Sequence, residues 1–271
     1  MGFKIGLKLW SVNADAYLSE AERLYADGTF SYIELFVVPG TENTLDAWRR
    51  LHDEKGVPFI IHNAHAAQGF NLADESAERK NVEIYRETRK FADDLGARYV
   101  IFHGGVDGSI KETARQLKAL EEPRALLENK PLAPIANPFG VKECRGATVE
   151  EIGFVLNEVK CGFCLDIGHA VCAANSQSIE PYGYVADLAD MFKPVMFHLS
   201  DISDTASPYD SHLHLGGGVL DIPRVCREIF SIDACITLET PKGRTDDFMD
   251  FELDVRIILE ASGANNGGVS C

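Results

Sequence analysis

Histidines and carboxylates gather at the ends of short apolar runs in this sequence. Residues of this kind are His65 (PFIIHNAH), His103 (RYVIFHGG), Glu128 (ALLEN), His198 (VMFHLSD) and Glu239 (CITLETP). Imidazole and carboxylate groups are the ligands that zinc and other divalent metals select. Scattered core histidines would show no relation to the ends of apolar runs, so this pattern indicates a metal site.

Two short motifs add further ligand-type residues. LDIGH holds Asp166 and His169 three positions apart, which can place both side chains over one opening as the chain leaves a strand. DSHLHLGGG holds Asp210 and His212, which alternate on one side of an extended loop. Nine such groups are too many for one four-ligand site, and a cluster of two or three metals accounts for them most simply.

The remaining histidines lack this context. We expect His52 on the surface and His62 behind the metal ligands, and His214 has no matching position. Trp10 and Phe36 fit either a pocket wall or the core. Taken singly, a histidine that ends a strand is more often a hydrogen-bonded structural group than a ligand, so the hypothesis rests on the whole set.

Eight β-rich runs recur along the chain, with helix-like stretches between them. Each run is nearly continuous in apolar residues, as expected of a strand buried on both faces. The predicted strands are 4–10, 32–37, 58–61, 99–102, 125–127, 162–165, 195–199 and 235–238. The predicted helices are 14–26, 44–55, 76–95, 110–120, 148–159, 183–191, 222–229 and 248–260. This alternation predicts an α/β fold, a single-domain (β/α)₈ TIM barrel over residues 1–262, with a flexible tail at 263–271.

The barrel explains the ligand pattern, because active sites of such barrels lie at the carboxyl ends of the strands. Six ligand-type residues are expected there, each from a different strand: His65, His103, Glu128, Asp166, His198 and Glu239. The long segment 130–147 and those after the sixth and seventh strands are candidate active-site loops. Asn63, Asn129 and Asp201 are candidates for orienting the imidazoles.

Composition restricts the cellular context and the partners. No run of about 18 apolar residues exists, so no membrane span is expected. The start MGFKIGLKLWSVN is too short and mixed for a secretory signal, and the seven cysteines lack framework spacing, so we expect reduced thiols and a cytoplasmic location. The net charge is −16, and the sequence has no run of basic residues of the kind that binds nucleic acid. Bound divalent cations would neutralise part of this negative charge.

The chain resembles the endonuclease IV family (AP endonuclease family 2), within the xylose-isomerase-like barrels. The resemblance runs from about residue 4 to residue 259 and is carried by HAAQGFNLA at 65–73, then IFHGG, LLEN, LDIGH, FHLSD, DSHLHLGGG and LETP. It implies a TIM barrel that hydrolyses phosphodiesters, with abasic-site DNA as the family's substrate.

The resemblance also implies a trinuclear zinc centre. One metal would be held by His65, His103 and Glu128. A second would be held by Asp166, His198 and Glu239, with Glu128 bridging. The third would be held by His169, Asp210 and His212.

The sequence departs from the family where DNA is bound. Members acting on DNA carry an aromatic residue three positions after the first histidine, and this chain has Gln68. The segment after the second strand, VVPGTEN at 37–43, offers no lysine or arginine to a minor groove. The start GLKLWSVN looks more like the sugar isomerases and epimerases of the superfamily. A phosphodiester or a small sugar-like substrate is therefore expected, with DNA unsupported by the charge.

The second hypothesis is a sugar or keto-acid isomerase or epimerase with one Mn²⁺, Mg²⁺ or Co²⁺. In that hypothesis Glu128, Asp166, His198 and Glu239 hold the metal, and the two glutamates act as the catalytic acid and base. Isomerase-like relatives share this tetrad, and several share His169. They do not usually need His65, His103, Asp210 and His212 together. A non-catalytic metal-binding module is disfavoured, because an open polar barrel mouth is a costly place to store unpaired ligands.

Overall fold

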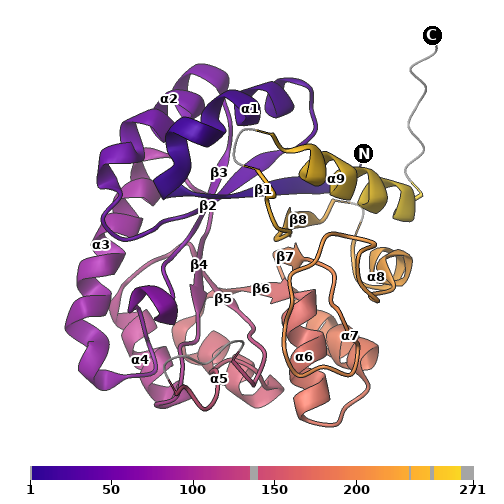
Figure 1. Cartoon of the computed structure of the whole chain (residues 1–271). Helices are drawn as coiled ribbons and strands as arrows, with labels where there is room; N and C mark the ends of the chain where they lie inside the picture. Colours follow the sequence, from indigo (N-terminus) through magenta and orange to yellow (C-terminus); the bar gives the residue numbers. More distant parts are fainter. Residues whose placement is uncertain (1, 135–139, 232, 245–246, 264–271) are drawn as a thin grey trace.

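The alternation of strands and helices closes on itself. The structure, a computed structural model, describes residues 2–134, 140–231, 233–244 and 247–263. Each strand pairs in parallel with its neighbours, and β1 pairs with β8, so the sheet forms a closed barrel (Figure 1). The strands are β1 (Lys4–Trp10), β2 (Tyr32–Phe36), β3 (Phe59–His62), β4 (Val100–His103), β5 (Ala125–Glu128), β6 (Gly162–Asp166), β7 (Met196–Leu199) and β8 (Cys235–Leu238).

Helices surround the barrel on its outside (Figure 1). They are α1 (Ala14–Ala26), α2 (Leu45–Lys55), α3 (Glu78–Asp94), α4 (Ile110–Ala119), α5 (Val149–Val159), α6 (Ile167–Ser176), α7 (Pro181–Phe192), α8 (Ile222–Glu228) and α9 (Met249–Ala261). The predicted single-domain (β/α)₈ fold is confirmed, with each strand end within one residue of its predicted position. The predicted tail 263–271 lies, apart from Gly263, outside the described residues.

The inner face of the barrel changes from apolar to ionisable along every strand. Its amino-terminal layer is a buried cluster of Tyr32, Ile60, Ile101, Leu126, Cys164 and Met196. Side chains two positions apart share a face of a strand, so the next inward positions lie toward the carboxyl end. They are Glu34, His62, His103, Glu128, Asp166 and His198. The apolar layer thus fills the amino-terminal end of the barrel, beneath a layer of histidine and carboxylate side chains.

Helix α6 follows β6 directly and was not among the predicted helices. Asp166 both ends β6 and caps α6, its carboxylate accepting the His169 N–H at 2.6 Å. No turn residues separate the two elements, and every residue from Ile167 to Ala174 is buried. A helix that is buried all round has no polar face to reveal its period in the sequence. The residues after the sixth strand are therefore a helix rather than a loop.

In the described part of the chain the cysteines are free thiols, and Cys164 lies in the apolar layer of the barrel interior. None of the helices in that part combines the length and apolar character needed to cross a bilayer.

Candidate metal centre

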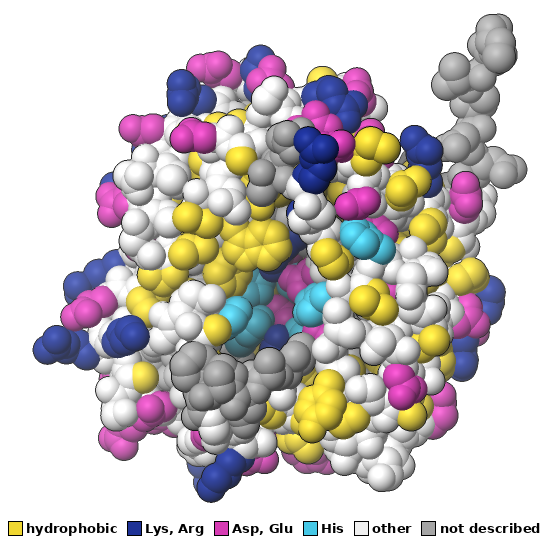
Figure 2. All heavy atoms as spheres, viewed as in Figure 1, with side chains coloured by type: hydrophobic (Ala, Val, Ile, Leu, Met, Phe, Trp, Pro, Cys, Tyr) yellow, Lys and Arg dark blue, Asp and Glu magenta, His cyan; other side chains and the backbone are white. Residues whose placement is uncertain are grey.

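The ligand-type side chains meet in a hollow at the carboxyl ends of the strands. Figure 2 looks into this hollow: histidines and acidic side chains lie at its bottom, and hydrophobic side chains gather along one side. The cavity has a volume of about 280 Å³. It is lined by Lys8, Trp10, Phe36, His62, His65, His103, Glu128, Lys130, His169, His212, Glu239, Thr240 and Pro241. Trp10 and Phe36, which the sequence placed in either the core or the pocket, are therefore pocket walls.

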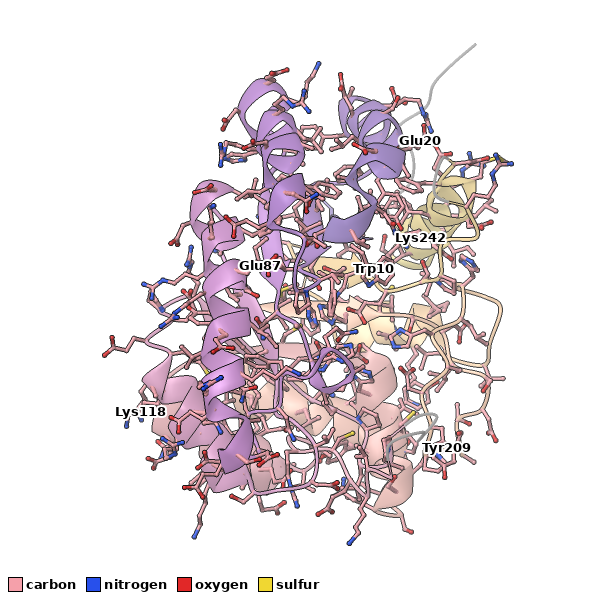
Figure 3. The ribbon with its side chains drawn as sticks, turned by 60° about the vertical axis from the view of Figure 1, so that its left-hand side comes forward. Trp10, Glu20, Glu87, Lys118, Tyr209 and Lys242 are labelled. Atoms are coloured by element: carbon pink, nitrogen blue, oxygen red, sulfur yellow. The ribbon has the colours of Figure 1, made fainter. Side chains whose placement is uncertain are left out.

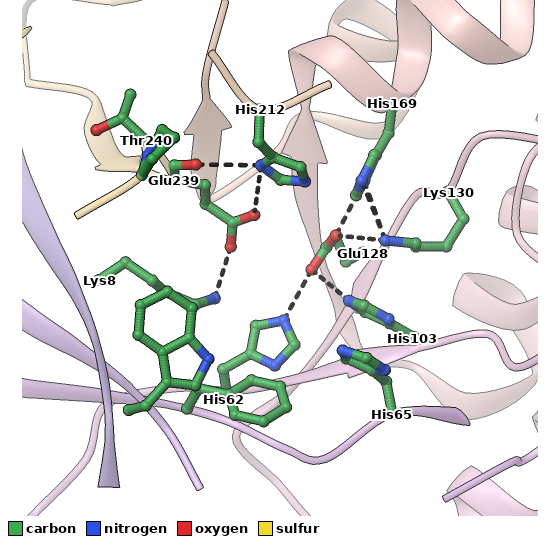
Figure 4. A pocket seen from close by; sticks show the side chains of 13 residues that line it. Lys8, His62, His65, His103, Glu128, Lys130, His169, His212, Glu239 and Thr240 are labelled. Carbon is green, nitrogen blue, oxygen red and sulfur yellow. Dashed lines mark hydrogen bonds and ion pairs between the residues drawn. The ribbon is translucent and has the colours of Figure 1, made fainter. Parts of the chain in front are cut away.

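Glu128 lies at the centre of the group (Figure 4). Its Oε2 is 3.1 Å from Nε2 of both His62 and His103, and its Oε1 is 3.1 Å from Nδ1 of His169. Burial opposes ionisation of this carboxyl, but His103 and Lys130 outweigh it and hold the pKa of Glu128 well below its usual range. Glu128 is thus an ionised carboxylate shared by several imidazoles.

A second group forms around Asp210 in the segment after β7. Nε2 of His169 lies 3.3 Å, and Nε2 of His212 2.5 Å, from Oδ2 of Asp210. The backbone of His212 has a φ of 44°, in the left-handed region that few residues other than glycine adopt. Strain of this kind persists where the surroundings enforce it, often at functional sites.

A third group joins β6, β7 and β8. His198 Nδ1 lies 3.2 Å from Oε1 of Glu239, 3.5 Å from Oε2 of Glu128 and 3.9 Å from Oδ2 of Asp166. The other ring nitrogen of His198, Nε2, is 2.9 Å from Oε2 of Glu34. Because one nitrogen is tied to Glu34, the other is presented to the three carboxylates.

Three buried atoms in these groups lie close to ionisable neighbours but make no hydrogen bond of acceptable geometry: Asp166 Oδ2, His198 Nδ1 and Asp210 Oδ2. Only one further buried polar side-chain atom of the described residues, Thr240 Oγ1, lacks a hydrogen bond. An unpaired buried polar atom costs several kcal/mol by order of magnitude, so such atoms are rare. All three belong to the predicted ligand set, and a cation among them would satisfy each one. The residues therefore fit bound divalent metals.

Supporting contacts orient the imidazoles, as metal sites require. The side-chain amide of Asn129 exchanges hydrogen bonds with the Asp166 backbone, at 2.7 and 2.9 Å. The Asn129 carbonyl lies 3.0 Å from Nδ1 of His169, and the Asn63 carbonyl 2.8 Å from Nδ1 of His62. Asn63 and Asn129 were predicted to orient imidazoles. They contact the ring nitrogens of His62 and His169 through their backbone carbonyl groups.

Asp201, the third residue predicted to orient the site, holds the loop that carries Asp210 and His212. Its backbone pairs with Leu213, and its buried carboxylate accepts N–H groups of residues 202, 216, 218 and 220. A Cβ at Gly218 would lie 2.2 Å from the Ile202 carbonyl oxygen, so only glycine fits this close approach. On the opposite side of the mouth, Glu87 of α3 accepts the N–H groups of Gly40 and Thr41 and fixes the segment after β2 (Figure 3).

His62 and His65 both line the cavity, and His62 is the one in direct contact with Glu128. His62 is buried in contact with Glu128, and the described residues offer His62, His103 and Glu128 as one group of potential ligand atoms. His65 stacks on His103 with ring centres 5.1 Å apart, and its Nδ1 accepts the Ala67 N–H at 3.3 Å. Burial lowers the pKa of His65 to about 3, so its ring is neutral. His65 therefore lies at the edge of the centre.

The two other histidines lie apart from the centre. His214 is 2.9 Å from Asp254, and His52 is half-buried against the Val57 carbonyl. Neither lines the cavity.

Two lysines and a glutamate of the centre were not predicted. Lys8 of β1 places Nζ 2.5 Å from both Glu34 Oε1 and Glu239 Oε1. Glu34 is completely buried and also accepts the Thr237 hydroxyl at 2.6 Å. Lys130 Nζ lies 3.5 Å from Glu128 Oε1 and 3.1 Å from His169 Nε2. Lys8 and Glu34 could have been predicted from the sequence, because each is a charged residue inside an apolar run, KIGLKLW and YIELF. A buried charge needs a partner of opposite charge.

Known proteins resemble the chain over most of its length. A family model described as "Xylose isomerase-like TIM barrel" matches residues 23–258. Endonuclease 4 of Thermus thermophilus is 29% identical over 212 residues, which cover 75% of this chain and 76% of that protein. Probable endonuclease 4 of Mycobacterium ulcerans is 30% identical over 194 residues, covering 68% and 74%.

Solved structures share the fold. Endonuclease IV from Thermus thermophilus superposes with a TM-score of 0.73 at 23% identity, covering 96% of this chain and 99% of that one. A D-tagatose 3-epimerase-like protein superposes with a TM-score of 0.71 at 20% identity, covering 100% of both chains. At these identities the likeness establishes the barrel fold, and the reaction has to be inferred from the residues of the site.

Proposed function

Because the chain belongs to the xylose isomerase-like TIM barrel family, we propose that its mouth is a multinuclear zinc centre that hydrolyses phosphodiesters. The observation that carries this proposal is the second group of ligands, His169, Asp210 and His212, next to the groups around Glu128 and His198. One metal has about four protein ligands, and these residues exceed that number. The relatives named endonuclease 4 support the same reaction class.

We assign the ligands in three groups, and the first two of them share Glu128. His103 and Glu128 bind the first metal with His65, and His62 offers a further imidazole to the same carboxylate. Asp166, His198 and Glu239 bind the second with Glu128. His169, Asp210 and His212 bind the third. The 3.1 Å contacts of both Glu128 oxygens with different imidazoles support a bridging role.

Bound divalent metals supply Lewis acidity and an acidified water for attack on phosphorus. The chain's own residues hold this chemistry in place. Glu34 fixes the ring of His198, the Asn129 carbonyl fixes that of His169, and Lys8 neutralises the buried Glu34 and Glu239. Trp10 and Phe36 wall the cavity with apolar surface, which restricts water around the reacting group.

The isomerase hypothesis remains the alternative, because Glu128, Asp166, His198 and Glu239 also converge. In that reaction Glu128 and Glu239 would pass a proton. Such an acid–base residue works best with a pKa near the working pH. Burial opposes ionisation of Glu239, but His198 and Lys8 hold its pKa well below the usual range. The Lys8 contact therefore favours hydrolysis.

Metal analysis tests the proposal directly. We expect purified protein to contain about three zinc ions per chain. Two four-coordinate sites that share one carboxylate would use fewer residues than the proposed ligand set contains. Elemental mass spectrometry gives the count, and chelation followed by zinc addition should abolish and restore cleavage of a phosphodiester and of an abasic-site duplex. One manganese or magnesium ion, no zinc and no diesterase activity would overturn the proposal.

His212→Ala separates hydrolase from isomerase. We expect it to lower diesterase kcat/KM by at least about a hundredfold, because the third ligand group loses one imidazole. The thermal transition should stay intact, because His212 is partly exposed. The control is His214→Ala, two residues away and outside the cavity, which should retain wild-type activity. Isomerase activity that survives His212→Ala, with no diesterase activity in the wild type, would favour the alternative.

A further inference from the structure

A second, larger cavity adjoins the metal centre. Its volume is about 760 Å³, within the range of small-molecule sites. Five residues line both cavities: His65, His103, Lys130, His169 and His212. Beyond them most of its described walls are small or apolar, among them Ala66, Ala67, Ala77, Val106, Pro131 and Pro134. The polar residues of these walls are Asn71, Asp74, Lys80 and Asp210. The metal centre therefore opens sideways into a recess suited to an apolar organic group.

Lys130 lines both cavities, at their junction. Figure 4 shows its ammonium group beside His169 and Glu128. Its ammonium group has three N–H donors. The nearest polar atoms are His169 Nε2 at 3.1 Å, His169 Nδ1 at 3.3 Å and Glu128 Oε1 at 3.5 Å. His169 Nδ1 is directed to the Asn129 carbonyl at 3.0 Å, which leaves Nε2 as the ring's acceptor.

Metal binding changes the partners of Lys130. The proposed third metal uses His169 Nε2, because this atom faces Asp210 Oδ2 at 3.3 Å. A nitrogen that binds a metal has no lone pair left for the ammonium group. Lys130 then retains one carboxylate oxygen at 3.5 Å, at the long limit of a hydrogen bond. A lysine whose side chain is only 15% exposed is thereby left with donors that face the shared cavity space.

From this geometry we propose that the substrate is a small organic phosphodiester anchored by Lys130. A non-bridging phosphate oxygen accepts from the Lys130 ammonium at the junction, and the group that stays on phosphorus fills the second cavity. This inference rests on the proposed hydrolase function. Water adds to phosphorus and one P–O ester bond breaks. The water hydroxyl stays on phosphorus and the other water proton ends on the leaving alcohol, so the products are a phosphomonoester and an alcohol.

The surface around the mouth favours a small substrate over duplex DNA. DNA binders neutralise phosphates with lysine and arginine, which supply most of the affinity. The segment 37–43 beside the hollow holds none, and the chain carries a net charge of −16. Hydrophobic side chains line one side of the opening instead (Figure 2).

The test compares Lys130→Met and Lys130→Arg with a matched control, Lys118→Met. Lys118 is an exposed lysine on α4 that lines neither cavity (Figure 3). Each zinc-loaded protein is assayed for metal content and, by calorimetry, for the Kd of inorganic phosphate. The substrates are bis(p-nitrophenyl) phosphate and methyl p-nitrophenyl phosphate, which share a leaving group and differ in the group retained on phosphorus.

We expect Lys130→Met to raise the phosphate Kd and both KM values by about tenfold or more, with unchanged metal content and a smaller change in kcat. Lys130→Arg should recover part of the loss. The wild type should bind the aryl diester more tightly than the methyl diester, because only the aryl group fills the recess.

Three results would overturn the inference: an unchanged phosphate Kd in Lys130→Met, an additional metal in that variant, or equal KM values for the two diesters. A kcat/KM for an abasic-site duplex far above both diesters would overturn the small-substrate class. If the wild type cleaves no diester while Lys130→Met loses phosphate binding, the hydrolase proposal fails and the anion site stands. If the wild type cleaves diesters and Lys130→Met behaves like Lys118→Met, only the inference fails.

Discussion

Replacing Glu128 by glutamine is expected to lower phosphodiesterase kcat/KM by about 10³-fold or more, because a metal supplies several kcal/mol of transition-state stabilisation. Both oxygens of Glu128 contact imidazoles, at 3.1 Å from His62, His103 and His169. Glutamine keeps the volume but removes the negative charge and presents an N–H₂ donor. We also expect the zinc content to fall, measured by elemental mass spectrometry beside the kinetics.

The control for this variant is Glu87→Gln. Glu87 is a carboxylate that accepts two backbone N–H groups outside the cavity, so its neutralisation tests a general effect of charge. Circular dichroism and thermal melting establish that the barrel remains folded. A Glu128→Gln protein with wild-type zinc content and kcat/KM would show that this carboxylate bridges nothing.

Lys8→Met is expected to destabilise the protein by about 3–5 kcal/mol, the usual range when one partner of a buried ion pair is removed. Glu34 is completely buried, and the variant leaves it ionised beside an apolar side chain. Burial lowers the pKa of Lys8, but Glu239 and Glu34 outweigh it and raise that pKa above its usual value. The contribution is therefore full below the ordinary pKa of lysine and is lost as pH rises through the raised one. Urea unfolding at neutral pH measures it.

The double variant Lys8→Met/Glu34→Gln isolates the ion pair from packing. Removing both charges should recover much of the lost stability, because the penalty arises from a buried carboxylate that has lost its lysine partner. A single Lys8→Met variant within about 1 kcal/mol of the wild type would contradict the prediction, since exposed ion pairs contribute that little.

The fold followed from the sequence because its strands are buried on both faces. An apolar run such as VIF at 100–102 needs no partner to be recognised, and eight such runs separated by helical patterns leave few topologies. The ligand-type residues were visible for a related reason. His103 and Glu128 interrupt an apolar run at its carboxyl end, where polar side chains line the barrel mouth.

Residues whose role depends on register were not predictable in the same way. Lys8 lies inside β1, and its contact with Glu34 follows from the β1–β2 pairing, in which the two residues are direct partners. His62 ends β3 facing inward, whereas His65, three residues later, lies beyond the strand at the rim. Spacing alone favoured His65. Only the closed barrel shows which of the two imidazoles meets Glu128.

The pairing of β1 with β8 has a consequence for how the protein is made. Lys8 lies near the amino terminus, and its partner Glu239 follows the last strand. A ribosome therefore releases the first strand long before the residue that completes its ion pair has been synthesised. Until then the barrel stays open, and the ligand-type side chains of its strands are not held together. We therefore expect the proposed centre to take up its metals after β8 has paired with β1.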